Sequence, residues 1–68
     1  MITVKVNGKQ ITVSEADYIK AKVADLREYG YTGLTESDVK SQLVLLLAGK
    51  QWTTVIGAFI ASDQPQVA

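Results

Sequence analysis

The feature that most restricts the fold is the Asn7-Gly8 dipeptide, which lies between two short runs of alternating apolar and polar residues. Asparagine and glycine tolerate the positive φ angles that both central residues of a type I′ turn require. With such a two-residue turn, Val6 pairs with Lys9, and each earlier residue of the first run pairs with a later residue of the second. The pattern therefore predicts a β-hairpin over residues 2–13.

The register of this hairpin sorts its side chains into two faces. One face is apolar and carries Ile2, Val4, Val6, Ile11 and Val13. The other face is polar and carries Thr3, Lys5, Gln10 and Thr12. Because a slip of one residue would mix the two sets, the turn and the pattern agree on a single register. We expect the apolar face to rest on the next helix, and the polar face is either a ligand surface or an ordinary solvated face.

A helix is expected directly after the hairpin. Ser14 can accept a hydrogen bond from the first-turn amides as the N-cap, and Asp17 can bond back to the Ser14 amide. Apolar residues then recur at the spacing of one helix face, at Ile19, Val23 and Leu26. Gly30 suits the left-handed residue that ends many helices. These signals predict a helix over residues 15–29.

The same capping pattern recurs at Thr35 and Asp38, and Gly49 suits the following C-terminal end. The core stripe of this second helix is formed by Val39, Leu43, Leu46 and Leu47. Val44 and Leu45 widen the stripe until the second half is apolar all round, which is typical of a helix that is buried on every side. A helix is therefore predicted over residues 36–48.

The segment 52–62 has two interpretations. Its β-branched and aromatic residues favour a strand, whereas helical spacing places Trp52, Val55, Ile56, Phe59 and Ile60 on one side. We favour a third helix, which gives a ββααα order, and keep a third strand and a ββααβ sheet as the alternative. Either order is an α+β fold within one small domain over residues 1–63, and residues 64–68 are expected to form a frayed terminus.

Composition argues against most enzymes and metal proteins. The chain has 68 residues, no cysteine and no histidine, so the common nucleophile–base pairs, disulfides and zinc ligands are missing. The closely spaced acids, Glu15 with Asp17 and Glu36 with Asp38, are explained as helix-start residues. We therefore expect a non-enzymatic protein with no catalytic residues, no cofactor and no metal. The apolar stretch 41–62 is interrupted by Gly49-Lys50-Gln51, which argues against a membrane span, and we expect a cytoplasmic protein.

A chain this short has a thin stability margin, and without disulfides or metals oligomerisation is the remaining support. The leading hypothesis is accordingly a small protein-interaction module that forms a homodimer. Its expected interface consists of Leu43, Leu45, Leu47, Trp52 and Phe59. A larger protein partner would need only the same apolar face. With a third helix, we also expect an open edge of the hairpin to extend across the dimer into a four-stranded sheet.

Two other surfaces remain open as alternatives. A nucleic-acid-binding regulator would use a weak patch of lysines, formed by Lys5, Lys9, Lys40 and Lys50. Seven basic residues balance seven acidic ones, however, and nucleic-acid-binding domains are normally basic. Tyr29, Tyr31 and Trp52 form either an exposed binding edge or ordinary core packing with hydroxyl groups that reach solvent.

Overall fold

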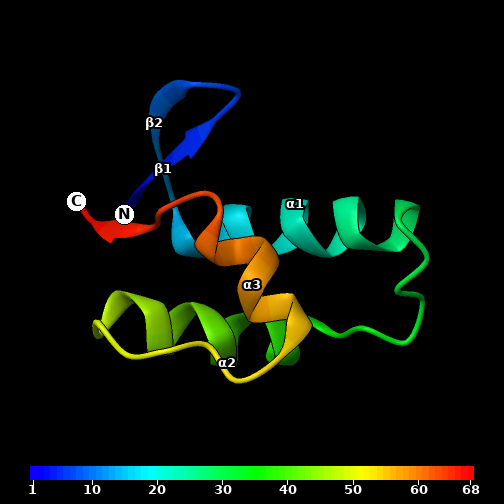
Figure 1. Ribbon diagram of the computed structural model, residues 1–68. Helices are drawn as coiled ribbons and strands as arrows, with labels where there is room; N and C mark the ends of the chain where they lie inside the picture. Colours follow the sequence, from blue (N-terminus) through cyan, green and yellow to red (C-terminus); the bar gives the residue numbers. More distant parts are fainter.

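The hairpin is followed by three helices and a short final strand. The computed structural model describes residues 1–68, with the elements β1 (Ile2–Val6), β2 (Lys9–Val13), α1 (Glu15–Glu28), α2 (Glu36–Leu47), α3 (Val55–Ala61) and β3 (Gln66–Val67). α1 and α2 run in opposite directions, α3 crosses between them, and the hairpin projects from one end of this helical layer (Figure 1). The α+β fold with an N-terminal hairpin is confirmed.

The hairpin has the register that the sequence predicts. Val6 pairs with Lys9, and the ladder continues to the pair Ile2 and Val13. Asn7 and Gly8 have φ angles of 53° and 78°, as a type I′ turn requires. Local turn chemistry and strand alternation therefore determine this part of the fold.

Both long helices begin at the predicted hydroxyl residues. The Ser14 hydroxyl accepts a hydrogen bond from the Asp17 amide at 3.1 Å. At the start of α2, Thr35 and Asp38 form a complete capping box, in which the Thr35 amide donates to the Asp38 carboxylate at 3.0 Å. These bonds satisfy amides that have no partner within the helix.

The third element is a helix, but it begins later than the pattern suggests. The Thr54 hydroxyl accepts from the Gly57 amide at 3.3 Å, so α3 starts at Val55 and leaves Trp52 in the preceding connection. Thr54 is a hydroxyl N-cap of the same kind as Ser14. The helical alternative is therefore correct for residues 55–61.

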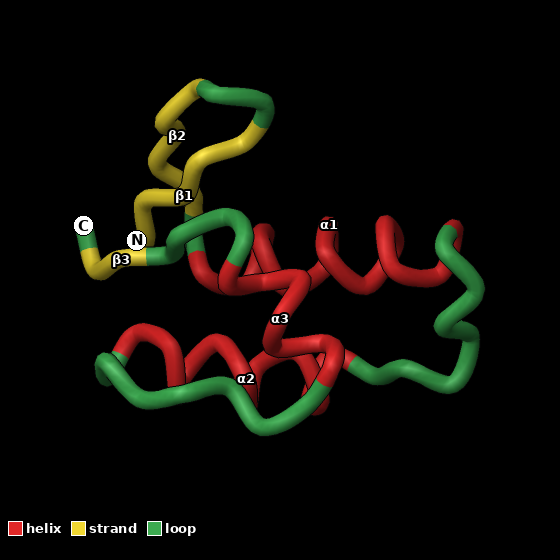
Figure 2. Tube along the Cα trace, viewed as in Figure 1, coloured by secondary structure: helices red, strands yellow, loops and turns green.

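The C-terminal residues differ from the expected frayed terminus. Gln66 pairs with Thr3 and Val67 pairs with Ile2, which gives a three-stranded antiparallel sheet with the order β2-β1-β3 (Figure 2). The second edge of β1 carries the backbone groups of alternate residues, Met1, Thr3 and Lys5, because those of Ile2 face β2. The C-terminal segment supplies their partners: the Met1 carbonyl accepts from the Ala68 amide at 3.3 Å, and the Lys5 amide donates to the Asp63 carbonyl at 2.7 Å. The sheet is thus larger by one strand than the predicted hairpin.

One core joins the hairpin to all three helices. Its buried side chains are Ile2, Val4, Tyr18, Ile19, Val23, Leu26, Leu34, Val39, Leu43 and Ile60. The second half of α2 is not buried on every side as expected, because Leu45, Leu46 and Leu47 are half-buried and Val44 is exposed. α3 and α1 pack against this helix, but they leave Val44 exposed.

A buried amide fixes the connection between α2 and α3. The Gln42 side chain donates to the Thr53 hydroxyl at 2.9 Å and accepts from the Thr53 amide at 2.9 Å. Gly57 lies directly against this pair, and a Cβ there would be closer than 3.0 Å to the Gln42 oxygen and to Trp52 Cβ. The approach of α3 to α2 therefore depends on a residue without a side chain.

Candidate functional site

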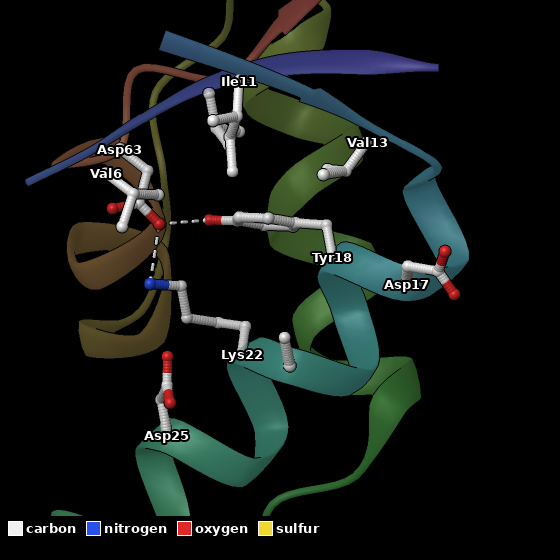
Figure 3. Close-up of a pocket in the computed structure, with 10 residues that line it drawn as sticks. Val6, Ile11, Val13, Asp17, Tyr18, Lys22, Asp25 and Asp63 are labelled. Atoms are coloured by element: carbon white, nitrogen blue, oxygen red, sulfur yellow. Dashed lines mark hydrogen bonds and ion pairs between the residues drawn. The ribbon is translucent and has the colours of Figure 1, made fainter. Parts of the chain in front are cut away.

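The apolar face of the hairpin overhangs α1 and leaves a groove with a volume of about 370 Å³. Only Ile2 and Val4 at the base of the hairpin are buried, whereas Val6 is 39% and Ile11 is 42% exposed. The groove is lined by Val4, Val6, Ile11, Val13, Asp17, Tyr18, Ala21, Lys22, Asp25 and Asp63. In Figure 3 the labelled aliphatic side chains point towards the Tyr18 ring, which forms the floor.

The groove arises from the way α1 follows β2. Ser14 alone separates the two elements, so α1 starts beneath the end of the sheet and the hairpin extends beyond the helical layer (Figure 1). The expectation that the apolar face rests on α1 therefore holds for the base of the hairpin alone. The outer part of the same face is left facing solvent.

One end of the groove is closed by three polar side chains. The Tyr18 hydroxyl donates to Asp63 Oδ2 at 2.6 Å, and Lys22 Nζ lies 2.6 Å from the same oxygen. The Lys22 ammonium also lies 5.7 Å from the centre of the Tyr18 ring. The Asp63 carbonyl in turn accepts from the Lys5 amide at 2.7 Å. Asp63 thus ties the C-terminal segment to both α1 and β1 (Figure 3).

The environment of Tyr18 strongly favours its neutral form. Burial of the ring raises the pKa of its hydroxyl well above the ordinary value, and the hydrogen bond to Asp63 and the negative charges of Asp63 and Asp25 raise it further. The hydroxyl therefore keeps its proton and acts as a hydrogen-bond donor. It is a poor general base or nucleophile.

This shift predicts a loss of stability in alkali. A pKa that is higher in the folded chain than in the unfolded chain stabilises the fold below the unfolded value, which for tyrosine is about 10. Above that pH, Tyr18 ionises more readily in the unfolded chain, so the free energy of unfolding should fall by up to about 1.4 kcal/mol per pH unit from this residue. Urea unfolding at a series of pH values, with tyrosinate absorbance recorded in parallel, measures the effect.

Tyr18→Phe is the matched control for the alkaline effect. The variant lacks the bond to Asp63 and is expected to be less stable by about 1–2 kcal/mol near neutral pH. The difference between the two proteins should shrink above pH 10, because the variant has no hydroxyl to ionise at this position. A difference that stays constant as the pH rises would contradict the raised pKa.

No group of three or more Asp, Glu, His or Cys side chains is placed to hold a metal ion. No helix reaches the length and apolar character that a membrane crossing would require. The lining of the groove thus consists of aliphatic side chains, the Tyr18 ring as its floor, and the ion pair of Lys22 with Asp63, whose charges are already paired. Such a lining can bind an apolar surface.

The five residues of the predicted interface do not form one surface. Leu43 is completely buried in the core of the single chain and is not available to a partner. Leu45 and Leu47 are half-buried on α2, and Trp52 is 44% exposed on the connection to α3. Phe59 is half-buried on α3 and faces a different group of residues.

That group is an aromatic cluster at the end of α1. Tyr29 stacks on Phe59 with ring centres 6.0 Å apart, and Tyr31 meets Phe59 edge-on at 5.7 Å. Tyr29 remains 73% exposed, so its ring is mostly in solvent. Tyr29 and Tyr31 flank Gly30 in the sequence. Their shared contact with Phe59 arises only when the chain is folded, so no local sequence pattern indicates it.

The four lysines of the nucleic-acid hypothesis are divided over the molecule. Lys5 and Lys9 lie on opposite faces of the hairpin, because Lys9 pairs with Val6. Lys40 belongs to α2 and Lys50 follows the end of that helix. Figure 1 shows α2 on the far side of the helical layer from the hairpin. The four charges therefore do not form one basic patch.

Asp63, which closes the groove, is the residue that sequence reasoning missed. Its position just before the expected frayed terminus gave it no role.

Comparisons with protein-family models, with curated proteins and with solved structures find no match to this chain.

Proposed function

We propose that this chain is a non-enzymatic protein-interaction module that acts as a homodimer, and that two copies associate through the apolar side of the hairpin. The observation that supports this is the exposure of Val6 and Ile11 on a surface that is otherwise used for the core. Burial of such side chains in a second copy contributes roughly 25 cal/mol per Å² of apolar area.

The first test is the molar mass in solution. Light scattering and sedimentation across the micromolar range should give a mass that rises towards twice the 7.4 kDa of one chain. Ile11→Glu should shift the midpoint to at least roughly tenfold higher concentration, because it places a charge in the contact. A chain that stays monomeric throughout would overturn the homodimer.

Val55→Glu is the matched control for this experiment. Val55 is 58% exposed and β-branched like Ile11, but it lies on α3, outside the groove. It occupies the first turn of a helix, where an acidic residue is tolerated. The variant should dimerise like the original chain. Loss of the dimer in Val55→Glu with retention in Ile11→Glu would transfer the interface to the α2 and α3 side and contradict the use of the hairpin.

A further inference from the structure

The outer edge of β2 is the long unpaired edge of the sheet. β2 lies at one end of the order β2-β1-β3, and residues 9–12 are all exposed. In Figure 1 the hairpin stands clear of the helices, with no other segment beside this strand. Natural proteins usually protect such an edge with proline, bulges or charges. Here the stretch from Gln10 to Val13 has none of these.

The direction of the free backbone groups follows from the ladder. The Lys5 amide donates to the Asp63 carbonyl on the β3 side of β1, so it points away from β2. Lys5 and its partner Gln10 are therefore a non-hydrogen-bonded pair, and the N–H and C=O groups of Gln10 point outwards. Thr12, two residues further along, has the same orientation. This edge thus offers two outward donors and two outward acceptors.

We infer that β2 pairs with β2 of a second copy, antiparallel and centred on Ile11, so that the two sheets join into one of six strands. In this register Gln10 of each copy exchanges two hydrogen bonds with Thr12 of the other, and all the outward groups of both residues are used. The side chains of the two Ile11 residues meet at the two-fold axis. The two-fold arrangement is self-complementary, as an isologous dimer requires.

Charge favours a second copy as the occupant of this edge. With Ile11 at the axis, Lys9 of one copy lies opposite Val13 of the other, on the face that carries the groove. Asp17 lines the groove beside Val13 and points outwards at the start of α1 (Figure 3). Each Lys9 therefore approaches an Asp17 of the other copy, and the two lysines are kept apart.

The inference rests on the proposed dimer and specifies its geometry, which a thiol can test directly because the chain has no cysteine. In Ile11→Cys the two Cα atoms should be about 4.5 Å apart, as in a non-hydrogen-bonded pair, and a disulfide fits that distance. Mild oxidation should convert this variant to a covalent dimer. Gln10→Cys is the matched control, since its two Cα atoms lie roughly 7–8 Å apart and a bridge should form at least about tenfold more slowly.

A second variant tests the backbone bonds. Gln10→Pro removes two of the four interchain hydrogen bonds and leaves the pairing with β1 intact, because the Gln10 N–H is not used there. Its dimer should dissociate at roughly tenfold higher concentration or more, whereas Gln10→Thr should stay within about twofold of the original chain. Circular dichroism checks that both variants remain folded.

The outcomes separate this inference from the proposed function. A dimer by mass that is sensitive to Ile11→Glu but forms no Ile11→Cys disulfide and tolerates Gln10→Pro would overturn the joined sheet and leave the homodimer standing. A chain that is monomeric at every concentration would overturn both. Rapid bridging of Ile11→Cys, slow bridging of Gln10→Cys and weakening by Gln10→Pro together support the six-stranded sheet.

Discussion

Gly57→Ala is expected to lower the free energy of unfolding by about 2–3 kcal/mol. The added methyl would be closer than 3.0 Å to the Gln42 side-chain oxygen and to Trp52 Cβ. Gln42 cannot move without breaking its two hydrogen bonds to Thr53. The same bonds hold the connection that carries Trp52 in place. The higher helix propensity of alanine, worth about 1 kcal/mol, offsets only part of the free-energy cost of this clash.

This loss is large for so small a chain. Typical stabilities of roughly 0.05–0.15 kcal/mol per residue imply only about 3–10 kcal/mol in total. A loss of 2–3 kcal/mol should therefore lower the melting temperature by roughly 10–20 °C, which thermal unfolding followed by circular dichroism would measure.

Gly33→Ala is the matched control for Gly57→Ala. A Cβ at Gly33 would meet nothing within 4 Å. This substitution should change the free energy of unfolding by less than about 1 kcal/mol, with stabilisation as the expected sign because it restricts the unfolded chain. Equal melting temperatures for the two variants would show that α3 does not approach α2 through Gly57.

The parts of the fold that follow from the sequence are those with local physical causes. The Asn7-Gly8 turn determines the register of the hairpin because the turn geometry and the alternation of Val4 and Val6 agree. Ser14 and Thr35 determine the helix starts because each side chain meets an amide three residues away. The same rule applied to Thr54 gives the start of α3.

The final strand has no such local cause. Gln66 and Val67 pair with Thr3 and Ile2, more than sixty residues earlier in the chain. A run of two residues is too short to show the alternation that indicates a strand, and the adjacent Pro65 favours an irregular terminal segment. The position of Asp63 depends on this return of the chain, so neither its bonds to Tyr18 and Lys22 nor the closed end of the groove could be predicted.

The location of the exposed apolar surface also could not be predicted from the sequence. Helical periodicity identifies Leu43 and Leu45 as apolar positions, but it does not tell which neighbour covers them. Equally, the hairpin pattern places Ile2 and Ile11 on one face without showing that Ile2 is buried and Ile11 remains 42% exposed. The choice between core and surface follows from the packing of elements that are distant in the chain.

Leu43→Ala tests whether Leu43, which is part of the subunit interface predicted from the sequence, belongs to that interface or to the core of one chain. Leu43 is completely buried within one chain, so the substitution should lower the free energy of unfolding by about 3–4 kcal/mol through lost burial and the cavity left behind. This is comparable with the lower end of the stability expected for 68 residues, and a larger share of the variant should be unfolded near 37 °C than of the original chain. Leu45→Ala, at a half-buried position on the same helix, should cost less than half as much.

The concentration dependence of the Leu43→Ala effect decides which role is correct. A core residue lowers the stability of the monomer itself, so the loss should be the same when urea unfolding is measured below and above the dimerisation midpoint. A residue at an interface would show its effect only where the dimer is populated, because association stabilises the folded chain by mass action. A loss that disappears on dilution would therefore return Leu43 to the interface and contradict its place in the core of the single chain.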